Sequence, residues 1–428
     1  MRTPGVRVPR STHRKQITVY ASPAPPSRPD IVSDCSAVSG RSARLSVFVF
    51  VDALGWRLLE RHPWFLEGLA EVRTSVETVL GYSCTCDPTI LTGCPPQEHG
   101  HFSFFRFDPE ASPFAGKPWW SRLPRALSER GRVRAWISRI ERYRLGYSGY
   151  FNLYGVPAEL LRWFVYTETR DLYQPGGIIG GQPTVFDRFT EAGIWCHTSD
   201  WRRNDAFNLA EAVSRAESGE PRCLYVYLSE LDAELHSDGT DSPRITERLR
   251  YYDRELRALF AAACGAYDDV GLHVFSDHGM SDVVGTSDVR HRVEHLGLTF
   301  GGDYAAVYDS TLARFWFSTD DARAKVHSVL DRESCGRVLS RAELGALGCD
   351  FADERYGETI FLLDPGYVLD PSFMGEWVPR GMHGYHPSHP DTAAAYLSNV
   401  PGLAPPRHLT DLHDLMLIDA GVEREIVA

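Results

Sequence analysis

Four short apolar runs in this chain are each joined to an Asp, a His or both. The joined residues are Asp52 after the first run, Asp232 and His236 after the second, Asp277 and His278 after the third, and His383 before the fourth. Continuous runs such as 47–51, rich in Val and Phe, are typical of strands that are covered on both faces. Because ligands in open α/β folds gather beyond the carboxyl ends of the strands, we expect these side chains to converge at one edge of a sheet.

A helix is predicted between the second and third of these strands. Ser242 is followed by Pro243, a residue that favours the first turn of a helix. Apolar residues then recur at spacings of three and four and give one apolar face: Ile245, Leu249, Tyr252, Leu256 and Leu259. With strands at 223–228 and 272–275, this is a strand–helix–strand unit. The sequence therefore predicts an α/β fold with a mostly parallel sheet flanked by helices.

The domain organisation follows from where this alternation begins and where it is interrupted. Residues 1–44 are rich in Arg, Pro and Ser, lack an apolar pattern and lack the apolar centre of a signal peptide. They predict a disordered basic tail, with a targeting or docking arm as the alternative. Residues 45–428 predict one large α/β domain with insertions, with two domains as the alternative. It is interrupted by aromatic-rich insertions at about 104–180 and 296–375, which are either caps over the site or ordinary packing elements with aromatic cores.

The composition and net charge of the chain argue against some classes of binding partner. A chain of 428 residues with 43% hydrophobic content can bury a substantial core, and a net charge of −12 argues against a nucleic acid polymer as partner. Nine irregularly spaced Cys without a CxxC pattern give no disulfide framework, which predicts a cytoplasmic protein. No apolar run approaches the roughly 18 residues of a membrane span, so no membrane partner is expected. The sequence leaves the oligomeric state open.

The converging Asp and His side chains predict a metal centre. Three carboxylates and three imidazoles in one place would repel one another or change protonation unless cations held them. Two divalent ions are the simplest solution. Mixed carboxylate and imidazole ligation suits Zn²⁺, with Mn²⁺ as the alternative, whereas an all-oxygen Mg²⁺ or Ca²⁺ site would not need three His.

A candidate nucleophile lies in the segment GYSCTCDPTILTGCPPQEHG at 81–100. Its later part predicts a helix that runs into a turn bounded by Gly and then Pro. A hydroxyl at the start of such a helix would benefit from the positive end of the helix dipole, and free N–H groups there could bind a phosphate. Ser83, Thr85 and Thr89 all carry hydroxyls, and local reasoning does not choose among them.

Taken together, these motifs resemble the alkaline phosphatase superfamily, and most closely its nucleotide pyrophosphatase/phosphodiesterase family. That family has a strand ending in Asp, a Thr or Ser ten residues before the Gly of a TG pair, P-x-x-HG, D-x-x-x-H, SDHGM and a late HGY. The corresponding residues here are Asp52, Ser83 before Thr92-Gly93, PQEHG at 96–100, Asp232 and His236, SDHGM at 276–280, and His383-Gly384-Tyr385. The resemblance spans about 45–110, 184–295 and 380–400.

The resemblance implies residue roles and a reaction. One metal would be held by Asp232, His236 and His383, and the other by Asp52, Asp277, His278 and the attacking oxygen of Ser83. The expected reaction is hydrolysis of a phosphodiester or pyrophosphate bond in a nucleotide or nucleotide-sugar substrate, through a covalent phospho-Ser83 intermediate. The alternatives are a phosphomonoesterase or a phosphonate C–P hydrolase of the same superfamily, then a phosphoryl transferase, then a binding protein without activity.

The sequence departs from the family pattern at two positions. The family usually reads T-x-P-N at the nucleophile, where the Asn helps to bind a phosphate oxygen, but Cys86 stands at the Asn position here. The late motif usually reads HGYD, and here His386 replaces the acidic residue. Neither change affects a predicted metal ligand, so both bear on the substrate and not on the chemistry of the metal centre.

Overall fold

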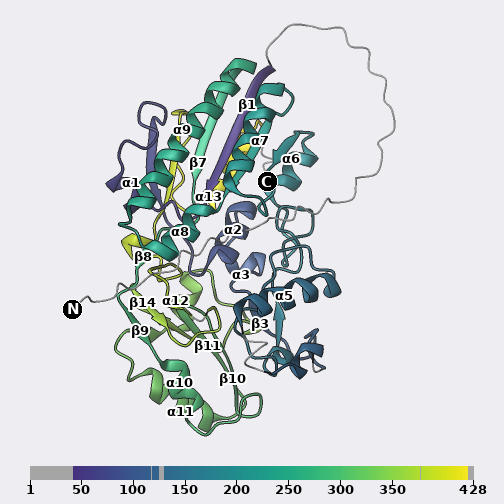
Figure 1. Ribbon diagram of the computed structural model, residues 1–428, viewed down its shortest axis with the longest axis vertical. Helices are drawn as coiled ribbons and strands as arrows, with labels where there is room; N and C mark the ends of the chain where they lie inside the picture. Colours follow the sequence, from purple (N-terminus) through teal and green to yellow (C-terminus); the bar gives the residue numbers. More distant parts are fainter. Residues whose placement is uncertain (1–41, 117, 125–129, 376, 423–428) are drawn as a thin grey trace, which may run out of the picture. The chain divides into compact units, whose positions relative to one another are not determined.

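The computed structural model describes residues 42–116, 118–124, 130–375 and 377–422, and its core is a central sheet (Figure 1). The six strands of this sheet run in the order β2 (Val72–Val76), β16 (Ala394–Ser398), β7 (Tyr267–Phe275), β1 (Ser42–Val51), β6 (Cys223–Leu228) and β5 (Cys196–Thr198). β1 pairs in parallel with β6 and β7, and β5 pairs in parallel with β6. β16 pairs antiparallel with both of its neighbours, β2 and β7. The predicted mostly parallel α/β fold is confirmed.

The two faces of β1 explain its uninterrupted apolar run. Val47, Val49 and Val51 point to one face and belong to a core that includes buried residues of α7 and α9. Phe48 and Phe50 point to the other face, into a core that includes residues of α2, α6 and α13. Figure 1 shows α7 and α9 lying along β1 and β7. The helices involved are α2 (Ser83–Thr92), α6 (Val185–Glu191), α7 (Asp205–Ser218), α9 (Pro243–Ala266) and α13 (Asp411–Asp419).

The predicted helix after Ser242 is α9, and its start is confirmed. The Ser242 side chain caps it by accepting a hydrogen bond from the backbone N–H of Arg244, and Pro243 occupies the first turn. All five residues of the predicted apolar face are buried: Ile245, Leu249, Tyr252, Leu256 and Leu259. Along the chain, β6 is followed by α8 (Glu230–Asp238), α9 and then β7. In the sheet, β1 lies between β6 and β7.

The two insertions fold into separate small elements that share one core. The first carries β3 (Phe105–Phe107), η1 (Trp119–Arg122), α5 (Gly131–Leu145), η2 (Leu161–Trp163) and β4 (Phe164–Tyr166). The second carries β10 (Tyr304–Tyr308), β11 (Leu312–Phe317), α11 (Asp320–Leu330), β12 (Gly336–Val338), α12 (Arg341–Ala346), β13 (Thr359–Leu363) and β14 (Tyr367–Leu369), with an antiparallel sheet in the order β10-β11-β13-β12. Phe105 and Phe164 of the first insertion share a hydrophobic core with Phe315 and Phe373 of the second.

Short elements connect these parts. They are α1 (Trp56–Arg61), α3 (Pro96–His99), β8 (Ser281–Asp282), β9 (Gly285–Ser287), α10 (Val289–Glu294), β15 (Gly381–Met382) and η3 (Pro390–Thr392). β8 pairs with β15, which brings the segment after β7 beside the segment that carries His383. No helix in the described part of the chain has the length and apolar character needed to cross a membrane.

The boundary of the predicted tail needs a correction. β1 already begins at Ser42, and its backbone pairs Ser42 with Tyr267 and Arg44 with Asp269 on β7. Residues 42–44, predicted above to lie in the tail, therefore belong to a strand. Backbone pairing with β7 compensates for their lack of an apolar pattern. The remainder of the predicted tail, residues 1–41, lies outside the described residues.

Candidate metal centre and active site

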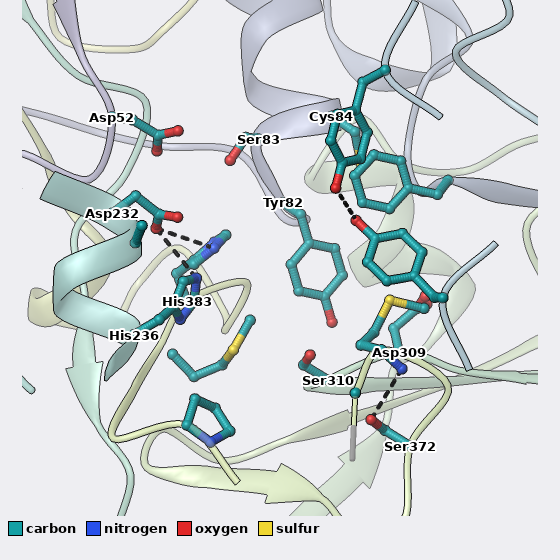
Figure 2. Close-up of a pocket in the computed structure, with 18 of the residues that line it drawn as sticks. Asp52, Tyr82, Ser83, Cys84, Asp232, His236, Asp309, Ser310, Ser372 and His383 are labelled. Carbon is teal, nitrogen blue, oxygen red and sulfur yellow. Dashed lines mark hydrogen bonds and ion pairs between the residues drawn. The ribbon is translucent and has the colours of Figure 1, made fainter. Parts of the chain in front are cut away.

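All the predicted Asp and His ligands except His383 lie just beyond the carboxyl ends of the parallel strands β1, β6 and β7. Asp52 directly follows β1, and its backbone N–H continues the pairing by donating to the carbonyl of Leu228 at the end of β6. Asp277 comes just after β7, and His383 follows β15. Asp232 and His236 lie on α8, which begins directly after β6. Figure 2 shows Asp52, Asp232, His236 and His383 around one pocket, as the position of the strand ends predicts for the first three.

The first group of possible ligands contains Asp232, His236 and His383. Asp232 and His236 are four residues apart on α8, so both side chains lie on the same face of the helix. Asp232 Oδ1 is 3.3 Å from His236 Nε2 and 3.8 Å from His383 Nε2. His236 Nδ1 lies 2.8 Å from the carbonyl oxygen of Gly381, and this contact favours a proton on Nδ1 and leaves Nε2 free for a metal.

The second group contains Asp52, Asp277 and His278. His278 Nε2 is 2.9 Å from Asp277 Oδ2 and 3.8 Å from Asp52 Oδ1. The backbone N–H of Ala53 donates to Asp277 Oδ1 at 3.1 Å and so orients that carboxylate. The hydroxyl of Ser83 lies 3.2 Å from His278 Nε2. All the residues predicted to hold each metal are therefore brought together in the predicted sets, while the binding of metal stays a prediction.

The donor atoms of both groups fit divalent cations. Asp52 Oδ1, Asp232 Oδ1, Asp277 Oδ2 and His383 Nδ1 are buried atoms without a hydrogen-bond partner. Such atoms are rare in folded proteins unless a ligand or ion satisfies them. Each group offers oxygen and nitrogen donors whose atoms lie within 4.8 Å of one another. This donor set suits Zn²⁺ or Mn²⁺.

The electrostatics of the two groups point in the same direction. Burial, followed by the charges of Asp277 and Asp232, raises the pKa of Asp52 well above its usual range. Burial, followed by His278 and His236, lowers the pKa of His383 well below its usual range. Burial opposes protonation of His278, but the neighbouring Asp277 raises its pKa overall. A carboxyl group whose charge is disfavoured by its neighbours, beside the His383 imidazole that resists protonation, is the arrangement that a divalent cation would stabilise.

The structure separates the three candidate hydroxyls. Ser83 is the first residue of α2, and its hydroxyl lines the pocket beside the second group. Thr85 is fully buried and donates to the carbonyl of Phe102 at 2.6 Å. Thr89 is also fully buried, donates to the carbonyl of Thr85 at 2.9 Å and lies 2.9 Å from His99 Nε2. Only Ser83 among these three can reach a substrate, which agrees with the residue that the resemblance implied.

Beyond Ser83 the pocket extends to a volume of about 550 Å³. Both insertions contribute residues to its wall, and they share one hydrophobic core. Their role as caps over the site stays a prediction. The first insertion supplies Phe104, Tyr150, Tyr154, Glu168, Asp171, Leu172 and Tyr173. The second supplies Asp309, Ser310, Val368, Leu369, Asp370, Ser372, Met374 and Gly375. Figure 2 shows Asp309, Ser310 and Ser372 across the pocket from the metal groups.

Several site residues were not identified from the sequence. The Tyr227 hydroxyl on β6 donates to Asp52 Oδ2 at 3.4 Å, but within an apolar strand it had looked like a core residue. Asp87 lines the pocket, whereas Cys86, at the expected Asn position on α2, is fully buried in the hydrophobic core. Asp87 follows Cys86 directly in the sequence. An acidic residue beside the position where the family has Asn was therefore the one sequence signal that could have identified Asp87. Glu168 lies in an insertion without a recognisable motif.

The second departure from the expected pattern lies outside both metal groups. His386 Nε2 is 3.3 Å from Glu343 Oε1, and His386 belongs to neither group of possible ligands. His383 is thus distinguished from its neighbour His386 by position, since β15 directs His383 into the pocket. The change at His386 removes an acidic side chain without altering the donor atoms of either group.

Comparisons with known proteins give both a family and a fold. The family described as Type I phosphodiesterase / nucleotide pyrophosphatase matches residues 46–386. Among solved structures, murine ectonucleotide pyrophosphatase/phosphodiesterase 5, as an inactive variant in complex with AMP, is 16% identical with a TM-score of 0.63, over 89% of this chain and 96% of that chain. The human protein of the same name is 14% identical with a TM-score of 0.63, over 89% of this chain and 95% of that chain.

Proposed function

Because the chain belongs to the Type I phosphodiesterase / nucleotide pyrophosphatase family, we propose that it is a divalent-metal-dependent hydrolase that acts through a covalent phospho-Ser83 intermediate. The bond cleaved is a phosphodiester or pyrophosphate bond in a small substrate of the nucleotide or nucleotide-sugar type. One observation supports this proposal more strongly than the other observations do. Ser83 lines the pocket at the start of a helix, and its hydroxyl lies 3.2 Å from His278 Nε2 in one of the two sets of metal-type ligands.

The position of Ser83 supports its role as the nucleophile. Its hydroxyl lies at the positive end of α2, where the first N–H groups of a helix have no partner within the helix. These groups can bind the phosphate oxygens that carry negative charge when Oγ attacks. Gly81 allows the backbone to turn sharply before the helix, with a φ of 132° that few other residues adopt.

The residues that would hold the two metals are those of the two groups. Asp232, His236 and His383 would hold one ion, and Asp52, Asp277 and His278 with Ser83 Oγ would hold the other. When bound, such ions lower the pKa of a coordinated hydroxyl and stabilise negative charge on the attacking and leaving oxygens. The hydrogen bonds from Ala53 to Asp277 and from Tyr227 to Asp52 fix the orientation of the carboxylates that hold the second ion.

The proposed reaction has two balanced steps. In the first, the Ser83 oxygen forms a bond to phosphorus while the bond to the leaving oxygen breaks, and the proton lost from Ser83 ends on the leaving group. In the second, water attacks phosphorus, the bond to Ser83 breaks and Ser83 regains a proton. The products are an alcohol, or a phosphate where a pyrophosphate bond is cleaved, and a phosphate monoester.

The charge of the pocket supports a diester over a monoester. The described residues that line it include no Lys and no Arg. A diester carries one negative charge on its phosphate, whereas a monoester carries close to two at neutral pH and would need more cationic partners. The structural relative in complex with AMP and the many aromatic side chains of the wall support a substrate with a flat or apolar group on the phosphate.

A panel of p-nitrophenyl monoesters and diesters tests the proposed function directly. Protein loaded with zinc or manganese should release p-nitrophenol from diesters with the higher kcat/KM, and chelation should abolish this activity reversibly. A higher kcat/KM for monoesters would favour the phosphatase alternative. A location in the cytoplasm is a further proposal, and fractionation of cells that express the protein would test it.

A further inference from the structure

Two cysteines lie opposite each other on the last two strands of the central sheet. β5 pairs in parallel with β6, and the register places Cys196 directly opposite Cys223. Neighbouring strands are about 4.7–4.9 Å apart, and disulfide-bonded cysteines have Cα atoms about 4.4–6.8 Å apart. The backbone therefore holds the two residues at a spacing that a disulfide can span.

The side chains of the two cysteines point to the same face of the sheet. Cys223 is fully buried in the core that contains Phe189 and Tyr225, and Cys196 is half-buried against this core. Both cysteines are thiols in the structure, and their Sγ atoms are 2.6 Å apart. A disulfide bond is about 2.0 Å long, so a small movement of the two sulfurs is enough to join them.

The pair lies away from the metal centre. Cys223 is the first residue of β6, whereas Asp232 and His236 follow the carboxyl end of that strand. Neither cysteine belongs to the two groups of possible metal ligands found among the described residues. A bond between the two sulfurs therefore leaves the donor atoms of both groups unchanged.

We propose that Cys196 and Cys223 form a disulfide when the protein meets an oxidising small-molecule disulfide such as oxidised glutathione. The thiolate of the half-buried Cys196 attacks one sulfur of the oxidant, a mixed disulfide forms, and one reduced thiol leaves with the proton of Cys196. Cys223 Sγ then attacks Cys196 Sγ, the bond to the small molecule breaks, and a second reduced thiol leaves with the proton of Cys223. Two protein thiols are oxidised, and the oxidant is reduced to two thiols.

The order of these two steps follows from burial. Burial, followed by the neighbouring Cys196, raises the pKa of the Cys223 thiol well above its usual range. Because the thiolate and not the thiol attacks a disulfide, Cys223 reacts slowly with an oxidant in solution. It is nevertheless held beside the Cys196 sulfur, so the mixed disulfide at Cys196 is converted to the internal disulfide.

The bond fastens one edge of the central sheet. β5 has three residues, and β6 is its one partner among the described strands. The bond joins positions that are 27 residues apart, on either side of α7, and so restricts the unfolded chain. Oxidation therefore stabilises the fold, and this inference is independent of the proposed hydrolysis. In a reducing cytoplasm the two residues stay thiols, whereas the bond forms in an oxidising compartment.

Peptide mapping tests the proposal on the full-length protein. Reduced protein is incubated with an excess of oxidised glutathione, unfolded in the presence of iodoacetamide and digested with trypsin without reduction. Cleavage after Arg places the two cysteines in separate peptides, 189–202 and 223–244, each with one Cys. Mass spectrometry should find these peptides joined in most of the protein, and dithiothreitol should separate them. Two alkylated peptides, two glutathione adducts or bonds to other cysteines would overturn the proposal.

Thermal unfolding of the same samples measures the stabilisation. Oxidised wild type should unfold about 4 °C above reduced wild type, and Cys196→Ser should lose this difference. Cys94→Ser, at another half-buried cysteine, is the matched control and should keep the difference of the wild type. A difference that persists in Cys196→Ser would assign the stabilisation to other cysteines and contradict the proposal. Should Cys196→Ser fail to fold, the peptide map of the wild type still decides.

Discussion

The imidazole rings of His278 and His383 stack face to face, with centroids 3.7 Å apart and ring planes inclined by 12°. His278 belongs to one ligand group and His383 to the other, so this stack is the direct contact between the two proposed metal sites. The two residues reach this contact from separate segments, one after β7 and one after β15. Because the rings touch, we expect the occupancy of one site to influence the position of ligands in the other.

The first prediction concerns metal content. The wild type should contain about two equivalents of zinc or manganese, since two complete sets of ligands are present. His383→Ala should retain about one equivalent, because it removes a ligand from one set and leaves Asp52, Asp277 and His278 in place. Elemental analysis of the purified proteins measures both values.

His386→Ala is the matched control for this experiment. His386 lies close to His383 in sequence but contacts Glu343 outside both groups, so this variant should keep the metal content of the wild type. A wild type that contains no transition metal and hydrolyses diesters in the presence of a chelator would contradict the metal assignment.

The ligands were predictable from the sequence because they follow strands that have strong signals of their own. β1, β6 and β7 each contain a short apolar run, and each strand is joined to its ligands within a few residues. The rest of the pocket could not be predicted in this way. Glu168 and Tyr154 lie in an insertion whose position depends on packing against the second insertion, over a shared core, and no local pattern encodes that contact. Tyr227 was missed because its pattern is that of a buried strand.

The second prediction concerns Gly81, which precedes the nucleophile. Its φ of 132° disfavours any side chain, and a Cβ at this position would lie 2.3 Å from Thr85 Oγ1. Gly81→Ala should therefore destabilise the fold by about 1–3 kcal/mol and displace Ser83, which lowers kcat. Thermal unfolding and steady-state kinetics measure the two effects.

Gly265→Ala on α9 serves as the control for Gly81→Ala. A Cβ there meets no atom within 4 Å, and alanine favours a helix over glycine, so stability should stay the same or rise by up to about 1 kcal/mol. Equal stability and equal kcat for the wild type and Gly81→Ala would show that the turn before α2 tolerates a side chain.

The third prediction concerns stability in acid. Burial disfavours the charge of Asp419. The neighbouring His273, whose Nε2 lies 3.1 Å from Asp419 Oδ2, and then Arg44 outweigh burial and lower the pKa of Asp419 to about 2. A carboxyl with a lowered pKa in the folded state stabilises that state above its unfolded pKa of about 3.9, and this contribution is lost as the pH falls towards 2. Asp419→Asn should therefore lose about 2 kcal/mol of stability at pH 7 and less at pH 3.

Urea unfolding of Asp419→Asn and the wild type at pH 7 and pH 3 measures this difference. Asp268→Asn, at an exposed position at the start of β7, is the control and should match the wild type at both values of pH. A difference between Asp419→Asn and the wild type that stays constant from pH 7 to pH 3 would show that the charge of Asp419 is not what stabilises the fold.

The last prediction separates the nucleophile from its neighbour on α2. Ser83→Ala should lower kcat by several orders of magnitude, because it removes the attacking oxygen. Its metal content should stay near that of the wild type, because Asp52, Asp277 and His278 still form the second group.

Thr85→Val should have the opposite effects, with lower stability and a nearly unchanged kcat. Thr85 is fully buried, and its hydroxyl donates to the carbonyl of Phe102 at 2.6 Å, away from the substrate. Losing this hydrogen bond should lower the free energy of unfolding by about 1–3 kcal/mol while kcat changes little. Stopped assays with a p-nitrophenyl diester, combined with urea unfolding, distinguish the two variants. An inactive Thr85→Val beside an active Ser83→Ala would shift the nucleophile by two residues and overturn the assignment of Ser83.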